Sequence, residues 1–205
     1  MMGRRWFLEF GLRKTVEVAV KVAGGNLASP PVRWFRPPFA GDEGAFLLAC
    51  TRCDKCIDVC PHGVVFRLPA RYGVRVAGTP VLDLLNRGCR LCEDWPCVAA
   101  CEPAALKRPE SGVGLPRLAF ARIDPAACLP YSGPECGGCS GSCPVPGALV
   151  FERGGKPRIL SDLCVGCGLC RAACIVHPKA VGLTIRTGGL PPAPDRGDTP
   201  DPFMG

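Results

Sequence analysis

The sequence predicts an α+β fold in which short strands and short helices surround cysteine-rich loops. The 205 residues include 26 glycines and 23 prolines, a composition that favours tight loops over long regular elements. The 47% of apolar residues is nevertheless too high for a disordered chain. The sixteen cysteines fall into four groups with related spacing. A strand, a cysteine loop, a helical turn and a second strand recur along the chain, so we expect an internal repeat.

Short apolar runs mark the expected strands. Residues 64–68 follow the first cysteine group, and residues 148–151 repeat this apolar run after the third group. Residues 117–123 and 181–185 alternate in polarity, which is the pattern of a half-buried strand.

The first cysteine group carries the most specific signal in the chain. Its spacing and the following Pro61 fit the bacterial ferredoxin run C-x2-C-x2-C-x3-C-P, whose last thiolate binds a partner cluster. The fourth group repeats the compact spacing, the second carries two extra residues, and the third inserts residues 129–135. The groups are Cys50, Cys53, Cys56 and Cys60; Cys89, Cys92, Cys97 and Cys101; Cys128, Cys136, Cys139 and Cys143; and Cys164, Cys167, Cys170 and Cys174.

Four [4Fe-4S] clusters are the predicted cofactors, because the sixteen cysteines supply four thiolates to each of four cubanes with none left over. Zinc is the main alternative, but structural zinc sites use two separated pairs of ligands. Disulfides are disfavoured, since cysteines three residues apart form geometrically awkward pairs. Without metal centres the core would be thin, so we expect the clusters to contribute much of the folding free energy.

The formal net charge of +7 treats every cysteine as neutral. Four cubanes, at roughly −2 each with their thiolates, would bring the loaded chain to about −1. No nucleic-acid-binding motif is present, so nucleic acid is not an expected partner. No apolar run approaches the ~20 residues of a membrane-spanning helix, so no transmembrane span is predicted, while peripheral membrane association stays open.

The termini differ in composition from the cysteine region. Arg4 and Arg5 precede apolar residues as in a twin-arginine leader, but charged residues interrupt the segment that follows, so an amphipathic helix is the alternative. The predicted domains are residues 1–29, this degenerate leader or helix; residues 30–49, a Pro-rich linker; residues 50–186, a four-cluster ferredoxin domain; and residues 187–205, a flexible tail.

Each two-cluster ferredoxin unit needs two cysteine groups, because each group lends its last cysteine to the other's cluster. The groups can pair sequentially or in a nested order, and their nearly equal intervals do not decide between the two. The first and fourth groups share the compact form, which favours nesting. We therefore expect an outer unit of residues 50–80 plus 155–186 around an inner unit of residues 81–154.

Further residues accompany the cysteines and carry a family resemblance. They are Arg36-Pro37-Pro38, Phe46, Arg52, Cys92-Glu93-Asp94-x-Pro96-Cys97, the seven-residue gap after Cys128, and Gly166 and Gly168. From the arginine pair to about Leu183 the chain resembles the NapG/MauM ferredoxin-type proteins, and through them the iron-sulfur subunits of molybdopterin oxidoreductases. The resemblance implies four ligand sets: Cys50, Cys53, Cys56 and Cys174; Cys60, Cys164, Cys167 and Cys170; Cys89, Cys92, Cys97 and Cys143; and Cys101, Cys128, Cys136 and Cys139.

The predicted function is electron transfer without substrate chemistry, because four thiolates for every cluster leave no iron site open for a substrate. The resemblance implies a relay of single electrons from a membrane or quinol-linked donor to a redox enzyme, and a periplasmic location. A charged leader that does not export the chain would leave it cytoplasmic or at the membrane surface. The alternatives are an iron-sulfur subunit of a cytoplasmic oxidoreductase complex and an iron-sulfur maturation or scaffold protein.

Overall fold

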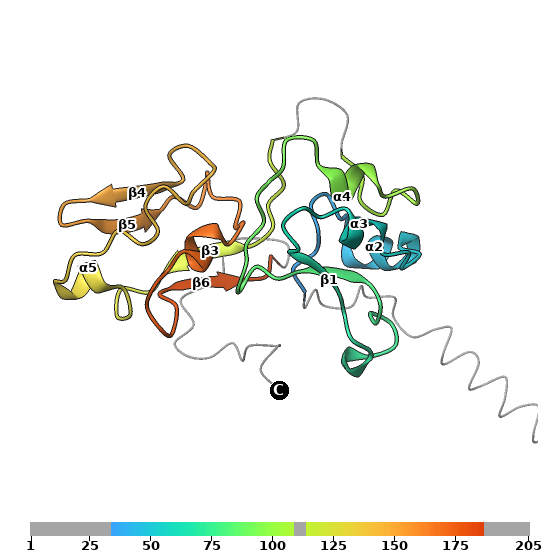
Figure 1. The fold of residues 1–205 in the computed structure, drawn as a ribbon, viewed down its shortest axis with the longest axis horizontal. Coiled ribbons are helices and arrows are strands. Elements are labelled where there is room, and N and C mark those ends of the chain that lie inside the picture. The colour runs from blue at the N-terminus through green and yellow to red at the C-terminus, as the bar shows by residue number, and fades with distance from the viewer. Residues whose placement is uncertain (1–33, 109–113, 187–205) are drawn as a thin grey trace, which may run out of the picture. The chain divides into compact units, whose positions relative to one another are not determined.

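The computed structural model describes residues 34–108 and 114–186 (Figure 1). The chain divides into two units, Met1–Pro30 and Pro31–Gly205, and every described residue belongs to the second. The predicted leader and the predicted tail lie outside the described residues. Short helices and two-stranded sheets make up the described part, in agreement with the predicted α+β class.

The strands of residues 34–108 form one hairpin. Its two strands, β1 and β2, pair antiparallel with Val65 opposite Leu82. A bridge between Ala40 and Leu106 joins the two ends of the segment. The elements are α2 (Glu43–Ala49), α3 (Lys55–Asp58), β1 (Val65–Arg67), the 3-10 helix η1 (Ala70–Tyr72), β2 (Pro80–Leu82) and α4 (Pro96–Ala99).

Residues 114–186 contain an inner hairpin and an outer strand pair. The inner strands β4 and β5 place Leu149 opposite Ile159, and the outer strands β3 and β6 place Ile123 opposite Val181. Strands β1, β3, β4 and β6 confirm the four runs predicted from the apolar pattern. The elements are β3 (Phe120–Ile123), α5 (Leu129–Ser132), β4 (Leu149–Glu152), β5 (Lys156–Ile159), α6 (Leu169–Ala172) and β6 (Val181–Thr184).

The strand pairing follows the order of the chain and contradicts the predicted nesting. Every strand pair of the described residues lies within residues 34–108 or within residues 114–186. Strand β3 of the expected inner unit pairs with β6 of the expected outer unit. Likewise, β4 of the expected inner unit pairs with β5 of the expected outer unit. Sequential pairing closes shorter loops than nesting, which lowers the entropy cost of bringing the strands together.

The prediction of a linker over residues 30–49 is wrong from Trp34 onwards. Trp34 and Phe35 are buried, and Pro37 and Pro38 are among the most fully buried side chains of the described residues. Proline has no backbone N–H, so a buried proline pair leaves no unsatisfied donor. A proline-rich composition is thus compatible with core packing as well as with a linker.

Helix α2 is fixed at its first turn. The Asp42 carboxylate accepts a hydrogen bond from the Ala45 amide at 3.1 Å and caps the helix. Arg36 donates to both carboxylate oxygens of Glu43, at 2.9 and 2.5 Å, and to the Thr79 hydroxyl at 2.8 Å. All three of these polar side chains are buried, so the arginine ties α2 to the start of β2.

One hydrophobic core runs through both parts of the described chain. Leu84 and Ala119, both 0% exposed, belong to the same buried cluster as Val165 and Cys167. The Leu118 amide also donates to the Val165 carbonyl at 2.7 Å. This core places the second and fourth cysteine groups next to each other.

Candidate metal centres

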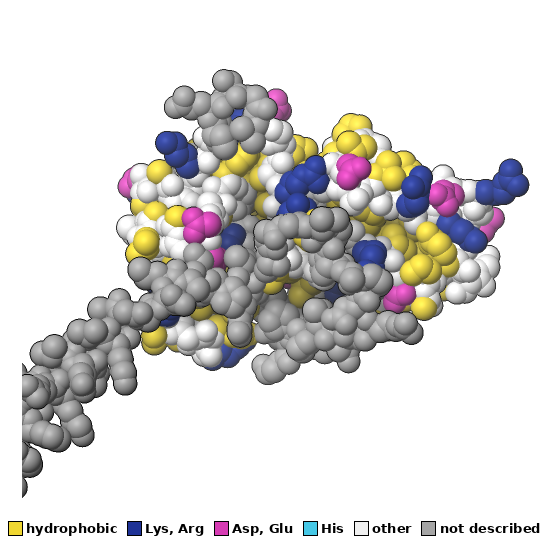
Figure 2. All heavy atoms as spheres, turned by 180° about the vertical axis from the view of Figure 1, so that it is seen from behind, with side chains coloured by type: hydrophobic (Ala, Val, Ile, Leu, Met, Phe, Trp, Pro, Cys, Tyr) yellow, Lys and Arg dark blue, Asp and Glu magenta, His cyan; other side chains and the backbone are white. Residues whose placement is uncertain are grey.

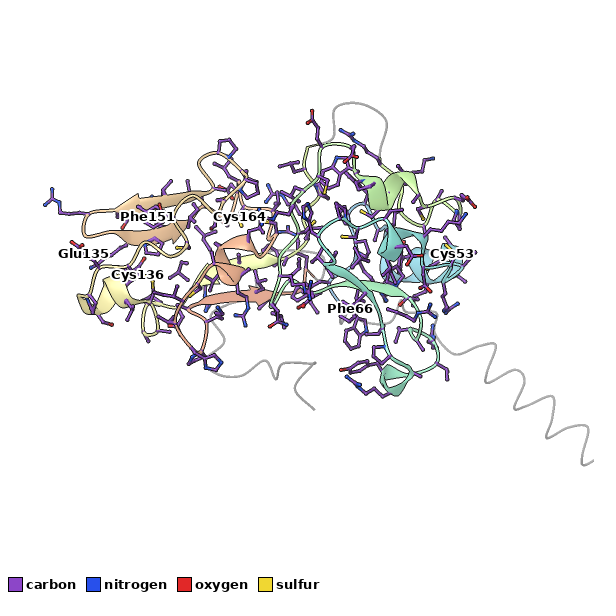
Figure 3. All side chains as sticks on the ribbon, in the orientation of Figure 1. Cys53, Phe66, Glu135, Cys136, Phe151 and Cys164 are labelled. Atoms are coloured by element: carbon purple, nitrogen blue, oxygen red, sulfur yellow. The ribbon has the colours of Figure 1, made fainter. Side chains whose placement is uncertain are left out.

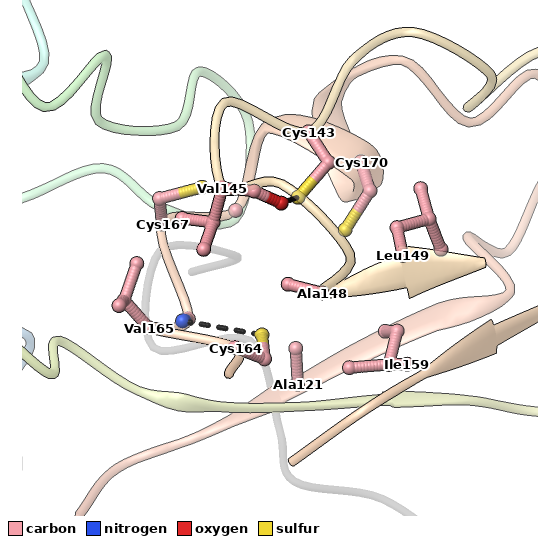
Figure 4. Close-up of a pocket in the computed structure, with 12 residues that line it drawn as sticks. Ala121, Cys143, Val145, Ala148, Leu149, Ile159, Cys164, Val165, Cys167 and Cys170 are labelled. Atoms are coloured by element: carbon pink, nitrogen blue, oxygen red, sulfur yellow. Dashed lines mark hydrogen bonds between the residues drawn. The ribbon is translucent and has the colours of Figure 1, made fainter. Parts of the chain in front are cut away.

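The cysteines gather around pockets in sets of four. Three pockets are each lined by four cysteines, and Figure 4 shows the one that contains Cys143 and Cys164. We name each set by one member. The Cys50 set is Cys50, Cys53, Cys56 and Cys101; the Cys89 set is Cys60, Cys89, Cys92 and Cys97; and the Cys164 set is Cys143, Cys164, Cys167 and Cys170.

The four remaining cysteines form the Cys128 set. Burial, and after it the neighbouring thiols of Cys139, Cys136 and Cys174, raise the pKa of Cys128. Cys139 likewise has Cys136 and Cys174 as its charged neighbours. Cys128 is buried beside Ile123 and Val181, with Cys139 and Cys174 packed against the same cluster.

The structure keeps together the first three cysteines of each sequence group, as expected, and changes the fourth cysteine that joins them. Cys101 instead of Cys174 joins Cys50, Cys53 and Cys56, and Cys174 joins the Cys128 set. Cys60 and Cys143 exchange places in the same way between the Cys89 and Cys164 sets. The pocket linings therefore favour a sequential grouping over the nested one. The cause is the strand pairing, which brings the first group to the second and the third to the fourth.

The cysteine loops share an unusual backbone. The residue before the second cysteine has a positive φ in three of the groups: 58° at Arg52, 53° at Leu91 and 69° at Gly166. The residue that begins the following helical turn is also left-handed, at Asp54, Trp95 and Gly168. Non-glycine residues rarely adopt this conformation, and such strain concentrates at functional sites.

The positive φ turns backbone amides toward sulfur. The Gly166 amide donates to Cys164 Sγ at 3.4 Å, drawn as a dashed line in Figure 4. The Leu91 amide, at the matching position, bonds to Cys89 and opposes the effect of burial on its pKa. The Leu106 amide donates to Cys101 Sγ at 3.3 Å. Hydrogen bonds to cluster sulfur are one of the means by which proteins set a reduction potential.

The buried thiols fit a cofactor that carries positive charge. Burial, together with neighbouring thiolates, raises the pKa of Cys56, Cys97 and Cys170 to about 12. Burial also raises the pKa of Cys89 and Cys167 to about 11. Thiolates so close together are stable only if iron compensates their charge, because metal binding displaces the thiol protons.

The cysteines of the sets are available as metal ligands. All sixteen cysteines are free thiols, so the structure contains no disulfide among them. Over residues 34–108 and 114–186, no three His, Cys, Asp or Glu side chains converge closely enough to hold one metal ion. Four thiols that line one pocket match the number of ligands that a [4Fe-4S] cubane takes.

The sequence analysis did not predict two features of the site. The Cys89 amide donates to the Cys167 carbonyl at 2.7 Å, which joins two cysteine sets from distant parts of the chain. Arg117 donates to the carbonyls of Ser161 and Cys164, at 3.0 and 3.4 Å, and so holds the last cysteine loop. Both depend on long-range contacts, which local spacing does not reveal.

Comparison with known proteins places the chain in a family. Over 196 residues it is 33% identical to the ferredoxin-type protein NapG of Escherichia coli (strain K12), with 87% of this chain and 84% of that protein covered. The chain belongs to the NapG/MauM family of ferredoxin-type proteins. It is also 31% identical to the methylamine utilization ferredoxin-type protein MauM of Methylobacillus flagellatus, over 91% of this chain and 85% of that protein.

A third relative extends the similarity. The ferredoxin-type protein NapF of Escherichia coli (strain K12) is 38% identical over 145 residues, which cover 69% of this chain and 80% of that protein. No protein-family model matches the chain, and no solved structure matches it. All three relatives are ferredoxin-type proteins, so family membership identifies the chain as an iron-sulfur electron carrier and not an enzyme, as the sequence predicts.

The described helices are short, and one face of the surface carries charges of both signs. Within the described residues, no helix is long and apolar enough to cross a membrane. On the face that Figure 2 shows, basic and acidic side chains are interspersed over apolar ones.

Proposed function

We propose that the chain binds four [4Fe-4S] clusters, one in each of the Cys50, Cys89, Cys164 and Cys128 sets. The observation that carries the proposal is the grouping of all sixteen cysteines into four sets of four. Each set combines three cysteines of one group with one from the neighbouring group, as two-cluster ferredoxins require. The sequential sets replace those that the family resemblance implied.

The four sets follow one another, which supports a relay of single electrons. Cys56 of the Cys50 set lies close enough to Cys97 of the Cys89 set to raise the pKa of its thiol. The Cys89 amide bonds to Cys167 of the Cys164 set, and Cys139 of the Cys128 set in the same way raises the pKa of Cys170. A bound cubane supplies the one-electron redox change, while the chain supplies the ligands and their order.

The residues between the sets exclude water and fix the sulfur environment. Apolar side chains such as Val165 and Ala148 line the pocket of the Cys164 set beside its thiols (Figure 4). The amides of Gly166 and Leu91 point at sulfur, so they stabilise its negative charge. A dry pocket with fixed amide donors limits the reorganisation that accompanies a change in cluster charge.

We further propose that the carrier links a membrane or quinol-linked donor to a redox enzyme, outside the cytoplasm if residues 1–29 export it. Family membership supports a carrier that serves a separate oxidoreductase. A subunit of a cytoplasmic oxidoreductase complex would use the same four sets, whereas a maturation protein would release its clusters readily. Location is tested by fusing residues 1–29 to a reporter that works only after export.

Anaerobic purification followed by iron analysis and redox titration tests the cofactor proposal. Four cubanes predict about sixteen irons per chain and fast, reversible one-electron reduction seen by paramagnetic resonance. Transfer of the clusters to an apo-acceptor during incubation would favour the maturation protein. Zinc in place of iron, or iron that is not reduced reversibly, would contradict the relay.

A further inference from the structure

We propose that an acidic redox protein docks on the surface around Cys53. This surface, the Cys53 surface, consists of Leu48, Arg52, Cys53, Val74 and Arg75. The inference rests on the proposed function, because it assigns the place where electrons enter or leave the Cys50 set.

Cys53 is the point at which a cysteine set reaches solvent. All sixteen cysteines lie in the described part of the chain, and Cys53 alone among them is exposed. Figure 3 shows its side chain at the outer edge of the cysteine loop, next to α2. A partner that exchanges electrons with the Cys50 set therefore has its closest approach at this loop.

Arg52 occupies a position where glycine would fold more easily. Its φ is 58°, and the matching residue of the fourth cysteine group is Gly166 with a φ of 69°. The Arg52 guanidinium is held outside the loop by the carbonyls of Ala77 and Arg75, at 2.9 and 3.1 Å. Arg52 thus accepts the strain that the loop imposes, as Leu91 does in the second group, and its charged end is fixed by backbone carbonyls close to the exposed Cys53.

The charge of this surface is only partly neutralised. Lys55 and Arg67 form ion pairs with Glu102 and Asp54, respectively. Among the described residues, no carboxylate lies within ion-pair distance of Arg52 or Arg75, and both are exposed. Arg52, which precedes Cys53, and Arg75, whose carbonyl accepts from Arg52, thus carry positive charges that no described carboxylate pairs with, and these charges would attract a negatively charged partner.

Exposed apolar side chains accompany these charges. Leu48 is 90% exposed and Val74 is 88% exposed, the two highest values among the large apolar residues of the described chain. Leu48 precedes the first cysteine by two residues, and Val74 is next to Arg75. Exposed apolar side chains in combination with charged ones are typical of transient protein interfaces. An anionic membrane would also attract the arginines, but only a redox protein needs to approach Cys53.

The test uses a negatively charged flavodoxin, fully reduced, as the electron donor to the loaded protein. Stopped-flow absorbance follows cluster reduction at ionic strengths from about 10 mM to about 500 mM, a range over which screening becomes nearly complete. The test variant combines Arg52→Gly with Arg75→Gln, since glycine is compatible with a positive φ. The control combines Arg122→Gln with Arg153→Gln, which removes the same charge from exposed sites elsewhere.

At low salt we expect the test variant to react about 10-fold more slowly and with a weaker salt dependence, and the control to stay within about 2-fold of the parent. Equal rates for both variants, with unchanged iron content, would overturn the docking site alone. A parent protein that binds no iron would overturn the proposed function as well. If the test variant no longer binds phosphatidylglycerol vesicles that the parent binds, while flavodoxin reduces both at the same rate, the surface would be reassigned to a lipid.

Discussion

The backbone amide of Cys89 donates a hydrogen bond to the carbonyl of Cys167 at 2.7 Å. These two residues belong to different cysteine sets. Cys89 lies in residues 34–108 and Cys167 in residues 114–186, and no strand pair links these two segments. Gly88 lies at the same contact with a φ of +78°, and a Cβ atom there would come within 2.8 Å of the Leu169 amide nitrogen. The contact is therefore close enough to exclude any side chain.

Gly88→Ala should separate the Cys89 and Cys164 sets. The added methyl group overpacks the contact and costs about 2 kcal/mol in the free energy of unfolding. We expect weaker magnetic coupling between the two clusters in the fully reduced protein, measured by paramagnetic resonance, with an unchanged iron content.

Gly154→Ala is the matched control for this change. Gly154 has a φ of +79° and no atom within 4 Å of an added Cβ, so only the backbone strain is shared. The Gly154→Ala variant should lose about 1 kcal/mol in the free energy of unfolding and keep the magnetic coupling between the two clusters. Equal loss of coupling in both variants would show that strain, not contact, is responsible.

Pairs of cysteine substitutions distinguish sequential from nested ligation. Cys53→Ser and Cys101→Ser should alter the same cluster, so their effects on the resonance spectrum should not add. The effects of Cys53→Ser and Cys174→Ser should add, because those residues belong to different sets. The reverse pattern would restore the nested grouping.

Gly166→Ala should damage the Cys164 set. A Cβ atom at Gly166 would overlap the backbone of Ala119, and no flexible side chain is there to move aside. We expect about four irons fewer per chain, the content of one cubane. Gly155→Ala, with a φ of +70° against +69° at Gly166 and open space around it, should retain all of its iron.

Arg36→Met should destabilise the protein strongly. It would leave the Glu43 carboxylate buried without its partner, which typically costs about 3 to 5 kcal/mol. Urea unfolding of the loaded protein, followed by circular dichroism under anaerobic conditions, measures this cost. Arg158→Met breaks the exposed pair with Glu152 and should cost less than about 1 kcal/mol. Similar losses in both variants would mean that burial does not distinguish the two pairs.

Composition misled the interpretation of residues 34–49. Prolines 37 and 38 suggest a linker, yet they are fully buried next to the Arg36 pair with Glu43. The buried role of this segment depends on Thr79, which lies far along the chain. No local pattern reports such a contact.

The sequence by itself determined what depends on neighbours along the chain. The first three cysteines of each group lie close together in the sequence, so three members of every set could be assigned from grouping alone, and the short strands followed from the apolar and alternating runs. The tertiary structure decided the fourth member of each set and the contact of Cys89 with Cys167. Both depend on which strands pair, and similar cysteine groups at nearly equal intervals allow two such pairings. Sequential loop closure and the shared core around Leu84 and Ala119 select one of them.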